Sequence, residues 1–236
     1  MKIKFLLLFC LFAANCSAQS EIKMFLNFNG QPLILNKEFC TSECGNFSVC
    51  GCKFFMCSPK IIRAGKETVF QNAYNYFDAD IQSSLIWQPD KKFKLKKGDT
   101  VEIVFGLDSI NNKNYRFKNA PESLMFWPDV LGGGYHYMKT DIRYTAYDSL
   151  PSVFNCHLGR GRICDEDNQP IQFLENFIKL KFAVYTDNEL IIDFDIMRFF
   201  GSYPAVDFNN YGGIMDDQQA MSFFIKRVKE TMKTKQ

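Results

Sequence analysis

The sequence is poor in histidine and tryptophan, and it has no apolar run long enough to cross a membrane. It contains only 2 His and 2 Trp in 236 residues, so any imidazole chemistry must use His136, His157 or both. The net charge of +2, with no basic run interleaved with aromatic residues, argues against a nucleic-acid partner. There is also no internal repeat and no Pro/Gly/Ser-rich linker, so we expect a single domain.

Residues 1–18 have the three parts of a signal peptide. Two lysines form a positive start, residues 5–14 are apolar, and small residues at 16–18 form a cleavage site. The apolar run is about half the ~20 residues that a membrane-spanning helix needs. We therefore expect export to the periplasm or the cell exterior, with no transmembrane segment. An outer-membrane lipoprotein is less favoured, because Asn15 precedes Cys16 where a small residue is required.

Cleavage after residue 18 leaves residues 19–236 as the mature domain, with 26 basic and 26 acidic residues and seven of the nine cysteines. Exported cysteines usually form disulfides. The candidates are Cys40, Cys44, Cys50, Cys52, Cys57, Cys156 and Cys164. Because seven is odd, at least one thiol is free, joined to another chain or bound to metal. On a strand Cys50 and Cys52 would share one face, which leaves a thiolate metal pair as the alternative there.

Alternating apolar and polar residues predict many short strands. The runs are residues 22–28, 33–39, 101–105, 178–184 and 190–196. Thr186-Asp187-Asn188, between the last two runs, has the composition of a hairpin turn. We predict an all-β fold, a two-sheet antiparallel β-sandwich.

The C-terminal segment departs from this pattern. Its apolar residues are spaced for one face of a helix, at Met221, Phe224, Ile225, Val228 and Met232. Acidic residues precede this segment and basic residues lie toward its end, as the helix dipole favours. We predict a C-terminal amphipathic helix packed across the sandwich.

Residues 125–139 are the most unusual stretch, with three successive glycines just before His136. They do not form a phosphate loop, because no Gly-Lys-Ser/Thr follows. We expect His136 in an aromatic-rich strand at 135–147, and His157 in a second strand. No Gly-x-Ser-x-Gly, cysteine-protease signature or conspicuous carboxylate pair accompanies them. We therefore expect no catalytic residue and no enzymatic activity.

Seven pieces of the sequence follow the order found in one known family. They are Phe25-Leu-Asn-Phe28 with 32–36, then 53–58, 104–109, Met125-Phe-Trp-Pro-Asp129 with 133–139, Asn155-Cys-His-Leu-Gly159, 192–200 and 212–215. Each piece is short, but together they span nearly the whole mature chain. In this order the sequence resembles the MbnP family of exported copper-binding proteins, in its Bacteroidetes-type branch.

The resemblance implies a β-sandwich and bound copper. In some members the Trp of the Met-aromatic-Trp motif is oxidised to kynurenine and joins histidines around the metal. The matching residues here are Trp127, His136 and His157. Met138 and Met215 are weaker candidates, because thioethers suit Cu(I), and core packing is the alternative role for both. The family also implies a dihaem cytochrome c peroxidase-like partner.

Two functions follow from these observations. The first is an exported copper-binding or copper-handling protein, which predicts that both imidazoles and Trp127 lie within one coordination shell. The second is a metal-free extracellular β-sandwich module that binds a partner protein or surface. That module predicts a broad exposed aromatic patch and no convergent histidine pair.

Overall fold

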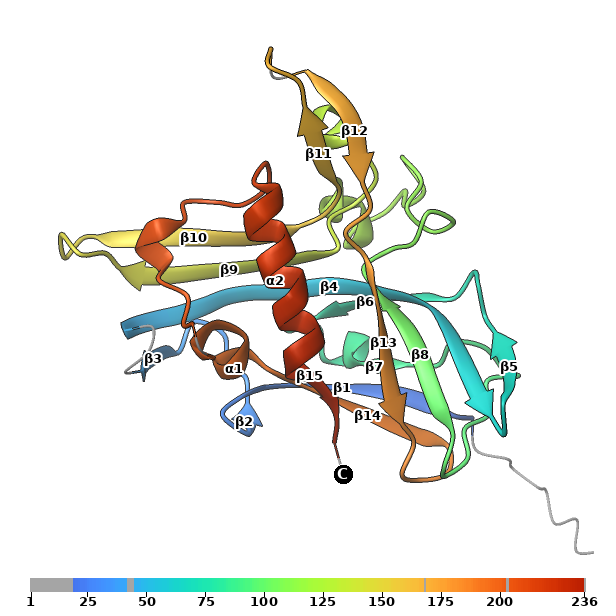
Figure 1. The fold of residues 1–236 in the computed structure, drawn as a ribbon. Coiled ribbons are helices and arrows are strands. Elements are labelled where there is room, and N and C mark those ends of the chain that lie inside the picture. Colours follow the sequence, from blue (N-terminus) through green and yellow to red (C-terminus); the bar gives the residue numbers. More distant parts are fainter. Residues whose placement is uncertain (1–18, 42–44, 168, 203, 236) are drawn as a thin grey trace, which may run out of the picture.

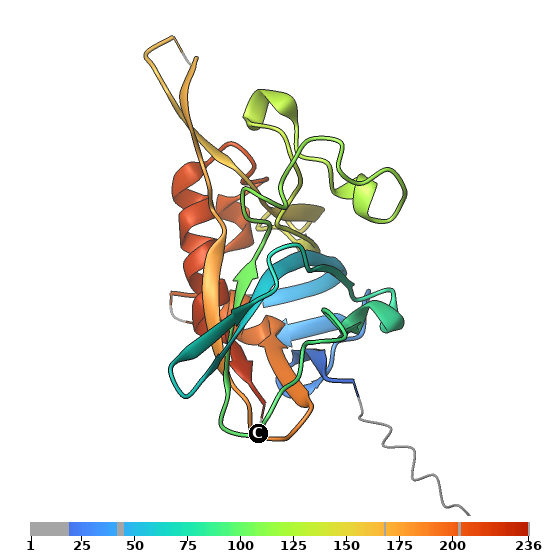
Figure 2. The same ribbon diagram turned by 90° about the vertical axis from the view of Figure 1, so that its right-hand side faces the viewer.

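The computed structural model describes residues 19–41, 45–167, 169–202 and 204–235. Strands dominate and form two main sheets that face one another, with few helices (Figures 1 and 2). The expected signal peptide, residues 1–18, and the disulfide candidate Cys44 lie outside the described residues. The prediction of an all-β sandwich is confirmed.

The first sheet has the order β15-β14-β1-β2, and β7 also pairs with β1. Its strands are β1 (Glu21–Phe28), β2 (Gln31–Pro32), β7 (Ile86–Trp87), β14 (Glu189–Asp195) and β15 (Met232–Thr234). This sheet is mixed where an antiparallel one was predicted, because β1 and β14 are parallel over seven residue pairs. Parallel neighbours need a long crossover, and nearly the whole chain lies between these two strands.

The second sheet has the order β10-β9-β4-β8-β13, and β3, β5 and β6 also pair with β4. Its strands are β3 (Glu38–Thr41), β4 (Gly45–Arg63), β5 (Lys66–Val69), β6 (Tyr74–Asp78), β8 (Thr100–Phe105), β9 (Met138–Thr145), β10 (Pro151–Leu158) and β13 (Ile178–Ala183). The 19-residue β4 is therefore the strand on which the sheet is built. A separate hairpin of β11 (Gly161–Cys164) and β12 (Pro170–Leu174) projects from one end (Figure 1).

Four of the five predicted runs coincide with strands β1, β8, β13 and β14. The strand predicted at 33–39 is wrong over residues 33–37, which cross from β2 in one sheet to β3 in the other, while residues 38–39 belong to β3. The hairpin at Thr186-Asp187-Asn188 is also wrong. The chain turns there, but β13 pairs with β8 while β14 pairs with β1, so the turn joins two sheets.

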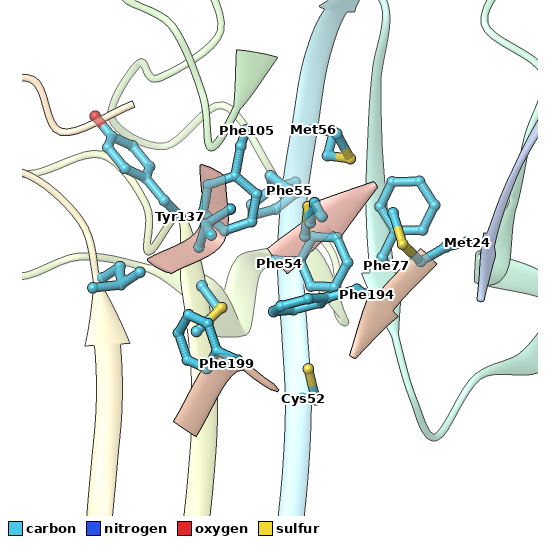
Figure 3. Packing of buried hydrophobic residues seen from close by; sticks show 14 of the residues in the cluster. Met24, Cys52, Phe54, Phe55, Met56, Phe77, Phe105, Tyr137, Phe194 and Phe199 are labelled. Carbon is cyan, nitrogen blue, oxygen red and sulfur yellow. The ribbon is translucent and has the colours of Figure 1, made fainter. Parts of the chain in front are cut away.

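The core between the sheets is rich in phenylalanine (Figure 3). Phe54 of β4 is fully buried, and its ring lies 5.2 Å from Phe77, 5.8 Å from Phe105 and 5.9 Å from Phe194, measured between centroids. Phe194 belongs to β14 of the first sheet, so Phe54 packs the two sheets together. Aromatic pairs at such distances add stability beyond their buried area.

The predicted C-terminal helix is α2 (Gln218–Thr231). Asp217 caps it by accepting a hydrogen bond from the Ala220 N–H at 2.8 Å, and four of the five predicted apolar residues are buried on it. The fifth, Met232, lies beyond the helix and begins β15, where it pairs with Phe194. The other α-helix, α1 (Ile196–Gly201), follows β14. In the described part of the chain, no helix has the length and apolarity to cross a membrane.

The segment between β8 and β9 packs on the outer face of β4. It contains η2 (Glu122–Met125) and η3 (Asp129–Leu131), while η1 (Gln82–Leu85) and η4 (Phe208–Asn210) lie elsewhere. Phe55 stacks on Phe117 at 5.2 Å, and Phe117 contacts Tyr135 at 4.5 Å. These rings anchor the segment that carries Trp127 and His136.

Candidate metal centre

Trp127, His136 and His157 come together in the structure. The ring centroids of Trp127 and His136 lie 4.7 Å apart, and those of His136 and His157 lie 5.2 Å apart, both edge to face. Nitrogen–metal bonds of roughly 2 Å allow two imidazoles at this separation to share one ion.

Backbone pairing explains how the two histidines meet. His157 lies on β10 opposite Lys139 of β9, three residues beyond His136. His136 was expected inside a strand at 135–147, but β9 begins only at Met138. The reason is that the N–H of His136 donates to the Met125 carbonyl at 2.6 Å, so residue 136 pairs with the wrapping segment instead of a sheet strand.

His136 is buried, with one ring nitrogen occupied and the other without a partner. Nδ1 lies 3.0 Å from the Met125 carbonyl oxygen. A carbonyl only accepts, so Nδ1 carries the proton and Nε2 keeps its lone pair. Nε2 is buried and has no hydrogen-bond partner among the residues that the structure describes. Burial lowers the pKa of His136 to about 3, so the ring stays neutral near pH 7.

His157 is oriented by a carboxylate. Its Nε2 lies 2.6 Å from Oδ1 of Asp141, so Nε2–H donates to the carboxylate, and in the neutral form of the ring the lone pair is on Nδ1. This hydrogen bond lowers the pKa of Asp141. Metal-binding histidines are commonly held by carboxylates in this way.

Asp141 was missed in the sequence. It belongs to β9, opposite Asn155 and two residues along each strand from the Lys139–His157 pair. The sequence shows only that Asp141 lies two residues after Lys139, and so on the same face of a strand. The pairing of β9 with β10, which brings Asp141 close to His157, cannot be inferred from neighbouring residues.

Trp127 is fully buried and tightly held. Its Nε1–H donates to the Leu131 carbonyl at 3.0 Å, and its ring lies over Gly159, where an added Cβ would come within 2.5 Å of the indole. An intact indole nitrogen is a donor only. Trp127 therefore lies at the site but offers no lone pair to a metal in its unmodified form.

The three glycines shape the approach to His136. Gly132, Gly133 and Gly134 all have positive φ, which only glycine adopts readily. A Cβ on Gly134 would lie 2.3 Å from Oδ1 of Asn112, and this same oxygen accepts from the Tyr135 N–H at 2.8 Å. The glycines thus let Asn112 fix the backbone next to His136.

The two candidate methionines are placed differently. Met138 pairs with Leu158, whereas Lys139 pairs with His157, and side chains alternate along strands. Met138 is fully buried on the opposite face of the sheet from His157. Met215 is half-buried against the core in the segment before α2.

The six described disulfide candidates are free thiols: Cys40, Cys50, Cys52, Cys57, Cys156 and Cys164. Cys52 and Cys156 both face Thr140, from β4 and β10 on either side of β9. Strands two apart are separated by roughly 10 Å, too far for a disulfide. Burial raises the pKa of Cys52 to about 12, which disfavours the thiolate that the alternative Cys50–Cys52 metal pair requires. Within the described residues, no group of three or more His, Cys, Asp and Glu side chains is arranged to hold a metal.

The sequence model of the MbnP family matches residues 17–216. The chain belongs to the MbnP family. Its fold is similar to that of MbnP from Methylosinus trichosporium, with a TM-score of 0.56 and 12% sequence identity, over 80% of this chain and 78% of that one. At that identity the likeness supports the fold alone. A search of curated proteins found no match, and the Bacteroidetes-type branch stays a prediction.

The buried ring of His136 predicts a pH-dependent stability. In the folded protein the pKa of His136 is about 3, below the ordinary 6.5. Between these two pH values the unfolded chain therefore binds a proton on His136 that the folded chain does not bind. This contribution to stability is complete above pH 6.5 and decreases as the pH falls toward 3. From pH 7 to pH 5 this contribution of His136 to the unfolding free energy of the metal-free protein should fall by about 2 kcal/mol. Denaturant unfolding at both pH values measures it.

The control for this prediction is His136→Gln, which keeps an amide donor for the Met125 carbonyl. The other histidine of the chain, His157, is present in both proteins. The difference in pH dependence between wild type and variant therefore reports on the ring of His136. Equal loss of stability in both proteins would contradict a buried neutral His136.

The packing of Trp127 on Gly159 gives a second prediction. Gly159→Ala places a methyl group against the indole, so Trp127 must shift, at a cost of about 1–3 kcal/mol in unfolding free energy. The indole fluorescence should change as well. Gly212→Ala is the matched control, since nothing lies within 4 Å of its added Cβ. Identical behaviour of the two variants would refute the tight contact.

Proposed function

We propose that this MbnP-family protein is an exported copper-binding or copper-handling protein, and that His136 and His157 are its ligands. The observation that carries the proposal is the buried Nε2 of His136, which has no partner and lies beside a second imidazole. A buried polar atom without a hydrogen bond is costly. A bound metal ion would give that lone pair the partner it lacks.

The donor set favours copper over the other common metals. Imidazole suits copper, zinc, iron and nickel, but structural zinc takes four protein ligands. Here two imidazoles converge, and among the described residues no third His, Cys, Asp or Glu side chain completes a metal-binding group with them. Cu(I) is satisfied by two or three ligands. Protons do not compete at His136, because burial keeps its pKa low.

Trp127 would complete the site in a modified form. In kynurenine the former indole nitrogen is an arylamine, which has a lone pair that tryptophan lacks. The short distance from Trp127 to His136 supports this role. We further propose a dihaem cytochrome c peroxidase-like partner as the oxidising enzyme, on the strength of family membership.

The second hypothesis, a metal-free binding module, receives no comparable support. It predicted no convergent histidine pair, and the rings of His136 and His157 lie 5.2 Å apart. The proposal assigns no catalytic residue. Export to the periplasm or cell exterior remains part of it, because the N-terminal 18 residues have the composition of a signal peptide.

Anaerobic titration with Cu(I) against a chromophoric chelator tests the proposal. Wild type should bind one ion, and His136→Gln or His157→Gln should abolish competitive binding. Asp141→Asn should weaken affinity about 10–100-fold, because Asp141 only orients His157. Intact mass of protein from its native host reports on Trp127.

Met138→Leu is the matched control. It replaces a buried thioether with a side chain of similar volume, on the face of the sheet opposite to His157. Copper affinity should therefore stay unchanged. Circular dichroism and thermal unfolding show whether each variant is folded. Wild-type affinity in both folded histidine variants would overturn the proposal, as would loss of binding in Met138→Leu alone.

A further inference from the structure

A basic groove lies along β13, which is at the opposite edge of the second sheet from β10, the strand that carries His157. It has a volume of about 600 Å³, and four lysines line it: Lys179, Lys181, Lys229 and Lys233. They come from β13, α2 and β15, which lie near one another beside the C-terminal end (Figure 1). Four lysines from three elements therefore line one concave surface.

Local structure explains why these lysines face outward. On β13, Lys179 and Lys181 alternate with the buried Leu180 and Phe182. Lys229 lies in the last turn of α2 and is exposed. On β15, Lys233 is exposed and follows the buried Met232. Each lysine is thus held at the surface by an apolar neighbour in the core.

The charge of the groove is not balanced. Glu102 is its one lining carboxylate, and it is already held by Lys60 at 3.1 Å, with Lys181 at 3.8 Å. Lys179, Lys229 and Lys233 make no side-chain hydrogen bond or ion pair with the described residues. The whole chain has 28 basic and 26 acidic residues, so this excess is a local feature and does not reflect bulk charge.

Like charges gathered in a concave surface repel one another and attract an anion. A phosphate group carries more charge than a carboxylate and has more acceptor oxygens, so one phosphate can accept from several ammonium groups at once. Lysine is a common phosphate ligand as a compact point charge. We propose that this groove binds phosphate groups, supplied by an anionic lipid headgroup or by a soluble phosphate compound.

This site is independent of the proposed copper function. The test uses the full mature chain and three probes: inorganic pyrophosphate, phosphatidylcholine vesicles containing phosphatidic acid, and a glutamate-rich peptide. Wild type should bind at least one phosphate probe at low salt, and binding should weaken as salt screens the charges. Binding to pyrophosphate identifies a soluble ligand, and binding to vesicles alone identifies a headgroup.

The triple variant Lys179→Gln, Lys229→Gln, Lys233→Gln should bind the phosphate probe about tenfold more weakly or worse. The control replaces Lys66, Lys91 and Lys92 with Gln, which changes the net charge equally at exposed positions outside the groove, and it should bind as wild type. Equal losses in both triples would show a bulk charge effect and overturn the proposal. So would binding of neither phosphate probe, or peptide binding as tight as phosphate binding.

Discussion

The hydrogen bond from Nδ1 of His136 to the Met125 carbonyl is the contact on which the candidate centre depends. It selects one tautomer, and in doing so it leaves the lone pair on Nε2, a buried atom with no hydrogen-bond partner among the described residues. An orphaned buried acceptor costs free energy. Other contacts around His136 must offset that cost.

The contacts around His136 come largely from the segment between β8 and β9. It is anchored on β4 by the stacked rings of Phe55 and Phe117, and it is kept close to β10 because Gly159 leaves no side chain between the strand and the indole of Trp127. On the other face of β4, Phe54 joins the two sheets. One long strand therefore holds both the core and the support of the site.

The local part of this architecture could be predicted from the sequence, and the long-range part could not. Alternation identified β1 and β14, since it reports which side chains of a strand are buried. It carries no information on the partner strand, so the parallel pairing of β1 with β14 was missed. The same limit explains the turn at Thr186-Asp187-Asn188, whose composition is right for a turn but whose flanking strands enter different sheets.

The site shows the same division. Scarcity of histidine and the resemblance to one family identified Trp127, His136 and His157, and the structure brings these three rings together. Asp141 could not be found in this way, because its role depends on the register of β9 against β10. A shift of one residue in that register would turn Asp141 to the other face of the sheet.

This dependence on register would explain how two imidazoles can suffice in the proposed copper site. In the described part of the chain, no group of three or more His, Cys, Asp and Glu side chains is arranged to hold a metal, so the selectivity of the proposed site would not come from the number of donors. It has to come from orientation, that is, from which nitrogen of each ring is left free. The Met125 carbonyl decides this for His136 and the Asp141 carboxylate decides it for His157. The two groups that orient the proposed ligands are therefore a backbone oxygen and a side chain, and neither would need to touch a bound metal.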